Sequence, residues 1–269
     1  MNLEHMIDCL AHAYGPRGWW PLPSKAGQDG RNPAGYLLSH SLPVGSCAQG
    51  PDASGSERKS RQAARFEIAV GAILAQNTAW RGASKAVAAL ATQGLLEPDA
   101  ILEIEASELA AILRPAGTFA RKAVYLKTLA AAWPDLDVGT PKRPELLALR
   151  GIGHETADCI LCYCYGQPRF VADAYARRIT ARCGAAPAGL GYEELRRLAE
   201  AELPADALYL AEAHALLVEH AKRHCRARPL CSGCPLATSC PAVTPSQTDR
   251  VGKTPRQPGI FINPRKSFP

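Results

Sequence analysis

The chain has 269 residues and a hydrophobic content of 47%, enough to bury one large core or two smaller ones. The formal net charge is +6 at pH 7, but five basic residues and one acidic residue within 241–269 already contribute +4. The rest of the chain is only weakly basic, which argues against a surface that binds through uniform positive charge. No apolar run is long enough to cross a membrane.

The ten cysteines limit the possible compartment and the kind of cysteine site. The first residues lack the pattern of a signal peptide, so we expect a cytoplasmic protein without an export signal. In a reducing compartment, clustered cysteines indicate a metal or an iron–sulfur cluster more often than disulfides.

The first predicted element is an amphipathic helix over residues 1–14, where Leu3, Ile7 and Leu10 recur at helical spacing. Trp19 and Trp20 follow it and allow two interpretations: an anchor in the core beneath a loop, or a wall of an aromatic pocket. Residues 23–60 are rich in Gly, Pro and Ser without a sustained period. They are predicted to form a surface insertion in which Cys47 is an exposed thiol.

A buried helix is predicted over residues 61–75, and the polar turn Gln76–Trp80 that ends it is a candidate site. Further helices are predicted over 83–93, from 98, over 108–113 and over 118–133, the last carrying Lys122. No stretch indicates a strand, and the 3.6-residue periodicity predicts an all-α protein.

Residues 144–165 carry the most informative pattern. A short helix over 144–150 is followed by Gly151, Ile152 and Gly153 and then by a second helix, which predicts a tight hairpin between two helices. Glycine adopts positive φ and lets a foreign backbone approach. The free N–H groups at the start of the second helix suit an anion such as a DNA phosphate. A lone Gly-x-Gly also fits an ordinary turn between helices.

Asp173 follows a loop and precedes a helix predicted over 174–183. This places it at an N-cap, a position that favours aspartate for structural reasons and contributes about 1 kcal/mol. The position by itself does not separate a structural cap from a catalytic carboxylate.

The last predicted helices span 195–203 and 206–224; His214, His220 and His224 on the second are expected to pack or to lie at the surface. A loop follows with the spacing Cys-x5-Cys-x2-Cys-x5-Cys, formed by Cys225, Cys231, Cys234 and Cys240. Four cysteines suit zinc as well as a [4Fe–4S] cluster. The single close pair with symmetric flanks favours the cluster. Arg226 and Arg228 in this loop are expected to contact phosphates.

Three segments, Leu149–Gly153, Thr156–Asp158 and Val171–Asp173, together resemble the helix-hairpin-helix and Gly/Pro-aspartate signature of the endonuclease III superfamily of DNA glycosylases. The resemblance implies an all-α, two-lobed fold and a hairpin that binds DNA phosphates with Gly151, Gly153 and Thr156. It also implies that Asp173 is catalytic and that the cysteine loop holds a [4Fe–4S] cluster. The first gap of this loop is one residue shorter than is usual in the superfamily.

Within the superfamily, Trp19–Pro21, Gln76–Trp80 and Arg114–Gly117 are similar to 3-methyladenine DNA glycosylase III. This similarity implies that aromatic residues sandwich the flipped base, at Trp19, Trp20 and Trp80. Glu155 is either part of this base pocket or an exposed charge in the first turn of its helix. Gln76 matches a residue that fills the gap left in the duplex, Thr118 occupies the position of an apolar wedge, and Lys122 is expected to contact DNA.

Lyase-active members of the superfamily carry a lysine two residues after the second hairpin glycine, where this chain has Glu155. A glutamate cannot form the Schiff base that a lyase needs. We therefore expect a monofunctional glycosylase, and an aromatic sandwich would favour a positively charged alkylated purine. Uracil, mismatched and oxidised bases are alternative substrates, because the shape of the pocket decides between them.

Two alternative functions stay open on the sequence. One is a bifunctional glycosylase and abasic-site lyase that uses another lysine, Lys122 first. The other is a non-catalytic iron–sulfur protein that binds DNA. In each case the expected partner is double-stranded DNA, with a damaged base for the enzymes, and we expect a monomer.

The expected domain organisation has four parts. Residues 62–166 form a helical barrel domain that ends in the hairpin, and residues 1–21 with 167–240 form an iron–sulfur cluster domain. Residues 22–61 are a flexible insertion, and residues 241–269 are a basic tail.

Overall fold

The computed structural model describes residues 1–17, 19–25 and 55–243. Within these ranges every regular element is a helix and there is no strand, which confirms the predicted all-α class. The same ranges contain no helix that combines the length and apolarity needed to cross a membrane. Cys47, most of the predicted insertion and nearly all of the predicted basic tail lie outside the described residues.

The chain divides into two compact units. Unit 1 comprises Met1–Arg17, Ala172–Leu203 and Ala213–Pro269. Unit 2 comprises Gly18–Val171 and Pro204–Glu212.

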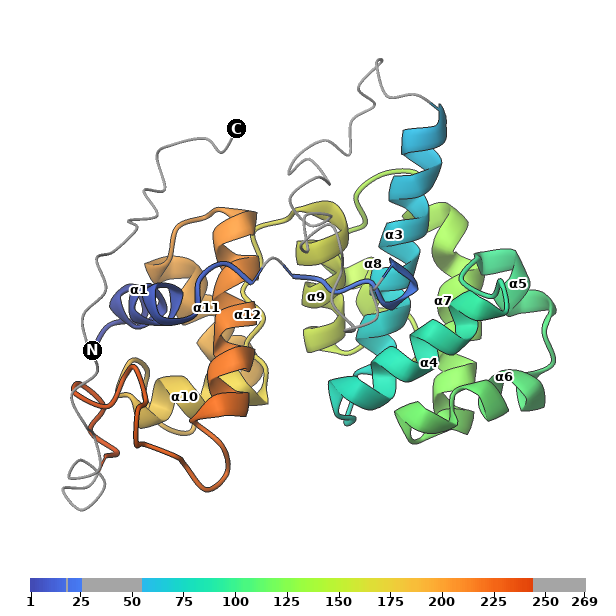
Figure 1. Ribbon diagram of the computed structural model, residues 1–269. Helices are drawn as coiled ribbons and strands as arrows, with labels where there is room; N and C mark the ends of the chain where they lie inside the picture. Colours follow the sequence, from blue (N-terminus) through green and yellow to red (C-terminus); the bar gives the residue numbers. More distant parts are fainter. Residues whose placement is uncertain (18, 26–54, 244–269) are drawn as a thin grey trace. The chain divides into compact units, whose positions relative to one another are not determined.

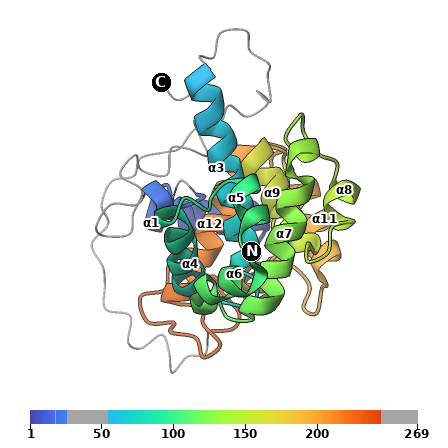
Figure 2. The same ribbon diagram turned by 90° about the vertical axis from the view of Figure 1, so that its right-hand side faces the viewer.

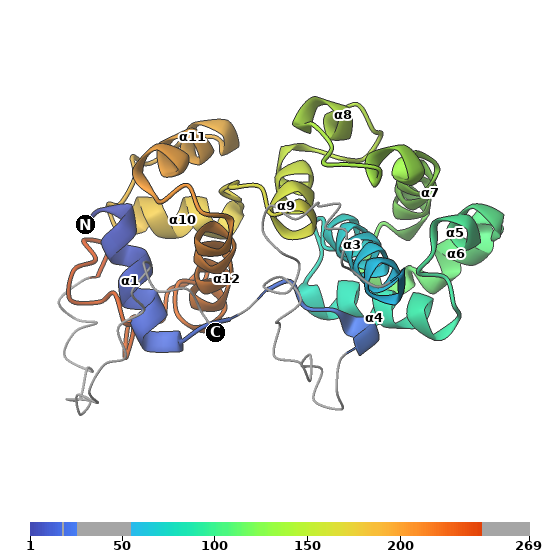
Figure 3. The ribbon, with the colours of Figure 1, turned by 90° about the horizontal axis from the view of Figure 1, so that it is seen from above.

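Unit 2 is built around a long helix, α3 (Gly55–Leu74), which packs against α4 (Trp80–Thr92), α7 (Phe119–Leu136) and α9 (His154–Tyr165). Figure 3 shows α3 nearly end-on, with α4, α7 and α9 around it. The remaining elements of the unit are short: η1 (Pro23–Lys25), α5 (Pro98–Glu103), α6 (Ala106–Ile112), η2 (Arg114–Ala116) and α8 (Arg143–Leu147).

The core of unit 2 is continuous along α3 and α9. Phe66 of α3 meets Trp133 of α7 edge-on, with ring centroids 5.2 Å apart. Every residue of α9 from Thr156 to Tyr165 is buried, so this helix has no solvent face beyond its first turn. A helix that is buried on all sides is expected to be apolar all round, which explains the unbroken apolar run seen in the sequence.

Unit 1 contains α1 (Leu3–Tyr14), α10 (Ala174–Arg182), α11 (Tyr192–Glu202) and most of α12 (Ala207–Arg223) (Figure 1). Leu3, Met6 and Leu10 of α1 are fully buried, which agrees with the periodicity expected for this helix. The cysteine loop follows α12.

The division into units differs from the predicted domain boundaries: residues 167–171, for example, belong to unit 2. Residues 204–212 belong to unit 2, because Tyr163 donates a hydrogen bond to the carbonyl of Ala211 at 3.1 Å. Trp20 also belongs to unit 2, since its ring packs edge-on against Trp80 and Tyr163, with centroids 5.4 and 5.2 Å away.

A buried ion pair joins α8 to α9, the two helices that flank the hairpin and pack against each other. Figure 2 shows α8 and α9 on the side of unit 2 that also carries α7. Asp158 is fully buried and receives two hydrogen bonds from Arg143, from Nε at 2.8 Å and from Nη2 at 2.9 Å. A two-pronged guanidinium–carboxylate pair fixes orientation as well as distance. It therefore sets the angle at which the chain enters and leaves the hairpin.

Replacement of Arg143 by methionine should destabilise the protein by about 3–5 kcal/mol, because it removes the paired guanidinium from a fully buried carboxylate. Chemical denaturation of Arg143→Met measures this loss. The double variant Arg143→Met/Asp158→Leu should recover most of the stability, and a double variant as unstable as the single one would contradict this account.

Candidate functional site

The two hairpin glycines have different structural roles. Gly151 has a φ of +94°, and a Cβ atom on it would lie 2.1 Å from the ring of Tyr125. Gly153 has a φ of −92°, is exposed, and has no atom within 4 Å of the position of a Cβ. Gly151 is therefore required by the fold, whereas Gly153 leaves open space at the N-cap of α9. Open space at the start of a helix, where backbone N–H groups point outward, suits an approaching phosphate.

Gln76 braces this hairpin from the end of α3. Its side-chain amide donates to the carbonyl of Gly151 at 2.8 Å and to the hydroxyl of Thr156 at 2.9 Å. Both amide hydrogens are thus used inside unit 2. Thr156 is buried, and its hydroxyl accepts the hydrogen bond from Gln76 within unit 2, so its side chain supports the hairpin from inside. The predicted part of Thr156 in DNA binding stays a prediction.

Asp173 is the N-cap of α10, as its sequence position predicted. One carboxylate oxygen accepts a hydrogen bond from the backbone N–H of Ala176 at 2.7 Å. The other lies 3.7 Å from Nε2 of His214 on α12. The side chain is largely buried, at 8% exposure of the residue. A carboxylate held at a helix N-terminus is stabilised as an anion by the helix dipole.

The tryptophans predicted to form a base pocket do not share one environment. Trp20 is only 5% exposed and belongs to the core of unit 2, as in the core-anchor interpretation. Trp19 and Trp80 are half-buried and pack on its ring system. Glu155 is exposed in the first turn of α9.

Lys122 lies in the core of unit 2 with only 1% of its surface exposed. Its ammonium donates to the carbonyls of Leu74 and Ala116, at 2.8 and 2.7 Å, and to the hydroxyl of Thr78 at 3.0 Å. Burial lowers the pKa of Lys122 to about 8. The prediction that Lys122 contacts DNA is therefore wrong, and an amine enclosed in this way is poorly placed to attack a sugar.

The cysteine loop is attached to α10 by two arginines that the sequence did not single out. Arg178 donates to the carbonyl of Cys225 at 2.9 Å. Arg182 donates to the carbonyls of Arg226 and Ala227 and lies 3.5 Å from Sγ of Cys225. Helix α10 thus carries Asp173 at its start and holds the cysteine loop at its end.

A second set of contacts reaches the loop from α1 and α12. The hydroxyl of Tyr14 lies 2.8 Å from Nδ1 of His220, and Nε2 of this histidine lies 3.9 Å from Sγ of Cys234. Burial, with a smaller effect of His224, lowers the pKa of His220 to about 4, so its ring is neutral. No local pattern in the sequence indicates this role of His220, because it depends on residues more than two hundred positions apart.

All four cysteines of the loop are free thiols within the described residues. Burial raises the pKa of Cys234 to about 11, and the neighbouring Cys231, Cys240 and Cys225 add to the rise. These thiols are therefore near enough to affect one another electrostatically. No group of three or more His, Cys, Asp or Glu residues in the described ranges is arranged to hold a single metal ion.

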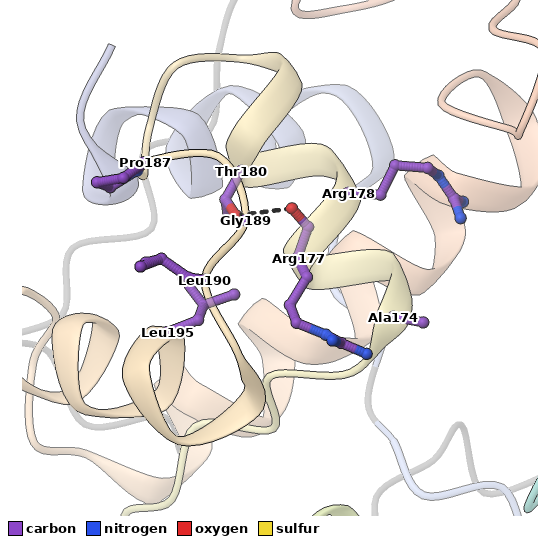
Figure 4. A pocket seen from close by; sticks show the side chains of 8 residues that line it. All are labelled: Ala174, Arg177, Arg178, Thr180, Pro187, Gly189, Leu190 and Leu195. Carbon is purple, nitrogen blue, oxygen red and sulfur yellow. Dashed lines mark hydrogen bonds between the residues drawn. The ribbon is translucent and has the colours of Figure 1, made fainter.

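The basic residues predicted to meet phosphates in this loop are exposed. Arg226 turns back to donate to the carbonyl of Lys222 at 2.7 Å. A separate cavity of about 360 Å³ lies in unit 1 between α10 and the segment that leads into α11. Figure 4 shows Arg177 and Thr180 on one side of this cavity, and Pro187 and Leu190 on the other.

The sequence matches one family model. A model described as HhH-GPD superfamily base excision DNA repair protein covers residues 70–205. A Methanocaldococcus jannaschii protein assigned as a DNA repair glycosylase is 37% identical over 172 residues, which are 60% of this chain and 78% of that protein. Endonuclease III of Sulfolobus acidocaldarius is 29% identical over 166 residues, which are 60% of this chain and 74% of that enzyme.

Solved structures give similar results. The H. pylori 3-methyladenine DNA glycosylase bound to 1,N6-ethenoadenine is 29% identical, with a TM-score of 0.51 over 59% of this chain and 85% of that one. A trapped covalent intermediate of endonuclease III with DNA has a TM-score of 0.60 over 66% of this chain and 84% of that one. Its identity of 23% limits this similarity to the fold.

Substitution of the two glycines by alanine should separate their roles. Gly151→Ala should destabilise the protein strongly, since the new side chain meets Tyr125 and the backbone is left-handed. Gly153→Ala should unfold like the wild type but bind duplex DNA more weakly, because its methyl group occupies the space open to a phosphate. Thermal unfolding and DNA titration measure the two effects. Equal losses of stability in both variants would contradict this distinction.

Proposed function

Since the chain belongs to the HhH-GPD superfamily of base excision DNA repair proteins, we propose that it is a monofunctional DNA glycosylase that removes alkylated purines from double-stranded DNA. The family match confirms the relationship inferred from the motifs. One observation carries the monofunctional assignment: Glu155 occupies the first turn of α9, at the position where lyases of this superfamily have their amine. The enclosure of Lys122 supports it by removing the first alternative amine.

The proposed substrate class rests on charge and aromatic surface. An alkylated purine can carry a positive charge, and the faces of tryptophan rings attract a cation by about 0.5–2 kcal/mol. Trp19 and Trp80 are the half-buried tryptophans of unit 2 that could offer such a face. The 29% identity to a 3-methyladenine DNA glycosylase adds to this preference.

The proposed chemistry assigns one catalytic group, Asp173. The bond between C1′ and the base nitrogen breaks, and its electron pair leaves with the base, which neutralises the charge of an alkylated purine. Water then adds to C1′ and gives up a proton. The carboxylate of Asp173 stabilises the positive charge that develops on the sugar. Its hydrogen bond to Ala176 keeps one oxygen fixed and orients the other.

We propose that Cys225, Cys231, Cys234 and Cys240 hold a [4Fe–4S] cluster. The donor set is four thiols, the ligation that such a cluster uses. When bound, the cluster cross-links the loop through its four sulfur atoms. Arg182 and His220 approach two of these sulfur atoms from outside the loop, as expected of groups that support cluster ligands.

Base release from duplex DNA containing alkylated purines tests the proposed activity. We expect strand breaks only after hot alkali, because a monofunctional enzyme leaves the abasic strand intact. Breaks without alkali, together with a covalent adduct trapped by borohydride, would establish a lyase instead. Specific binding without release of any base would favour a non-catalytic protein.

Replacement of Asp173 by asparagine should lower the rate of base release by a factor of at least about a thousand, since it removes the stabilising charge. Asparagine is also a good N-cap, so the fold should be kept. DNA affinity should change little. Single-turnover kinetics and a binding titration measure the two quantities, and base release near the wild-type rate would remove Asp173 from the catalytic role.

Replacement of Cys225 by serine should abolish the visible absorbance and the bound iron expected of the purified protein. Cys9→Ser on α1 is the matched control and should retain both. Stoichiometric zinc without iron in the wild type would replace the proposed cluster by a zinc site.

A further inference from the structure

Lys122 has a buried charge that the proposed reaction does not use. A protonated lysine has three N–H donors, and all three are matched, by two carbonyls and one hydroxyl. Leu74 is the last residue of α3, and Ala116 is the last residue of η2. The ammonium therefore joins the C-terminal ends of two helical segments, where the dipole of a helix favours a cation.

The two segments end in turns that touch each other directly. The hydroxyl of Thr78, after α3, donates to the carbonyl of Ala116 in η2. A Cβ atom on Gly82 would lie 2.3 Å from the carbonyl oxygen of Pro115, so only a glycine allows the start of α4 to approach this closely. Lys122 is therefore buried next to a close contact between the turn after α3 and η2.

Both turns carry unusual backbone. Asn77, with φ of 51°, and Thr118, with φ of 41°, are the non-glycine residues with positive φ in the described part of the chain. One lies in each of the turns that Lys122 joins. Such conformations persist only where the surroundings impose them, and they concentrate at functional sites.

The outer side of the joined turns is open to solvent. Asn77 and Thr118 are exposed, and Phe119 has 39% of its surface exposed although it is a large apolar residue. The guanidinium of Arg114 lies over the ring of Phe119, 5.9 Å from its centroid. An apolar side chain held on a rigid turn beside a basic group suits a duplex that is being opened, because such side chains enter between unstacked bases.

We infer that Lys122 is a positioning residue: its buried ammonium locks the turns at Asn77 and Thr118 into one rigid element that helps to extrude the damaged base. This inference rests on the proposed function. Extrusion costs a few kcal/mol and must be offset by contacts to the opened duplex. Turns that moved independently would have to be ordered on binding, which would weaken those contacts. Burial of an ammonium group costs stability, and a role in opening DNA explains why a lysine occupies this buried position.

Lys122→Met tests the inference, with two companion variants. Thr78→Val keeps the shape of the side chain but removes the shared hydroxyl, so it carries the test if Lys122→Met does not fold. Lys127→Met is the matched control: this lysine also lies on α7 and donates to two carbonyls, of Leu102 at 2.9 Å and Ile104 at 2.6 Å, away from the turns.

The probe is a duplex with one 1,N6-ethenoadenine opposite thymine and a 2-aminopurine next to the lesion. The rise in 2-aminopurine fluorescence at saturating protein reports opening without requiring excision. For Lys122→Met and Thr78→Val, we expect the fluorescence rise to be smaller than in the wild type by about fivefold or more. The reason is that the turns at Asn77 and Thr118 would no longer be held in their strained conformation. The dissociation constant should change by less than about threefold, and Lys127→Met should behave as the wild type.

A second duplex, with the lesion opposite an abasic analogue, separates positioning from general damage to the fold. Opening costs less there, so the variants should approach the wild type. Equal losses on both duplexes, an equal loss in Lys127→Met, or no fluorescence rise in the wild type would overturn the inference. A wild type that opens the duplex but releases no base would refute the proposed activity and leave the inference to be decided by the variants.

Discussion

The backbone of Gly151 lies so close to the ring of Tyr125 that no side chain fits between them. This contact fixes the hairpin on unit 2, and much else depends on it. It allows Ile152 to turn into the core, it places the open N-cap of Gly153 at the surface, and it starts α9, which is buried beyond its first turn. The ion pair between Arg143 and Asp158 and the amide of Gln76 then hold the hairpin from two further sides. A hairpin supported in this way can meet DNA with little loss of entropy.

In unit 1, helix α10 holds the candidate catalytic residue and the cysteine loop in place. The helix begins at the cap formed by Asp173 and ends at Arg182, whose guanidinium binds the cysteine loop. His214 and His220 on α12 approach Asp173 and Cys234 respectively. The carboxylate and the cysteine loop are thus attached to the same two helices. A cofactor bound by the loop would stabilise the surroundings of the carboxylate without taking part in the reaction.

Two buried charged groups in the core of unit 2 fix the orientation of the elements around them. Asp158 and Lys122 are each buried, and each is matched by partners of suitable chemistry. Such groups contribute little net stability, because the loss of hydration offsets the attraction. Their partners fix orientation instead. Arg143 fixes the orientation of α8 relative to α9, and the acceptors of Lys122 fix the positions of the turns after α3 and η2. Both charges therefore hold local geometry: one holds the hairpin and the other holds the turns after α3 and η2.

The sequence by itself determined the helical class, the hairpin, the capping position of Asp173 and the relationship to the superfamily. These features depend on residues that are neighbours in the chain, where periodicity, glycine and capping act locally. It did not separate Gly151 from Gly153, or show that Thr156, Trp20 and Lys122 are enclosed. Only the tertiary structure decided those points. Burial and partners come from segments far apart in sequence, such as Leu74 beside Lys122, and no local pattern records which of them meet.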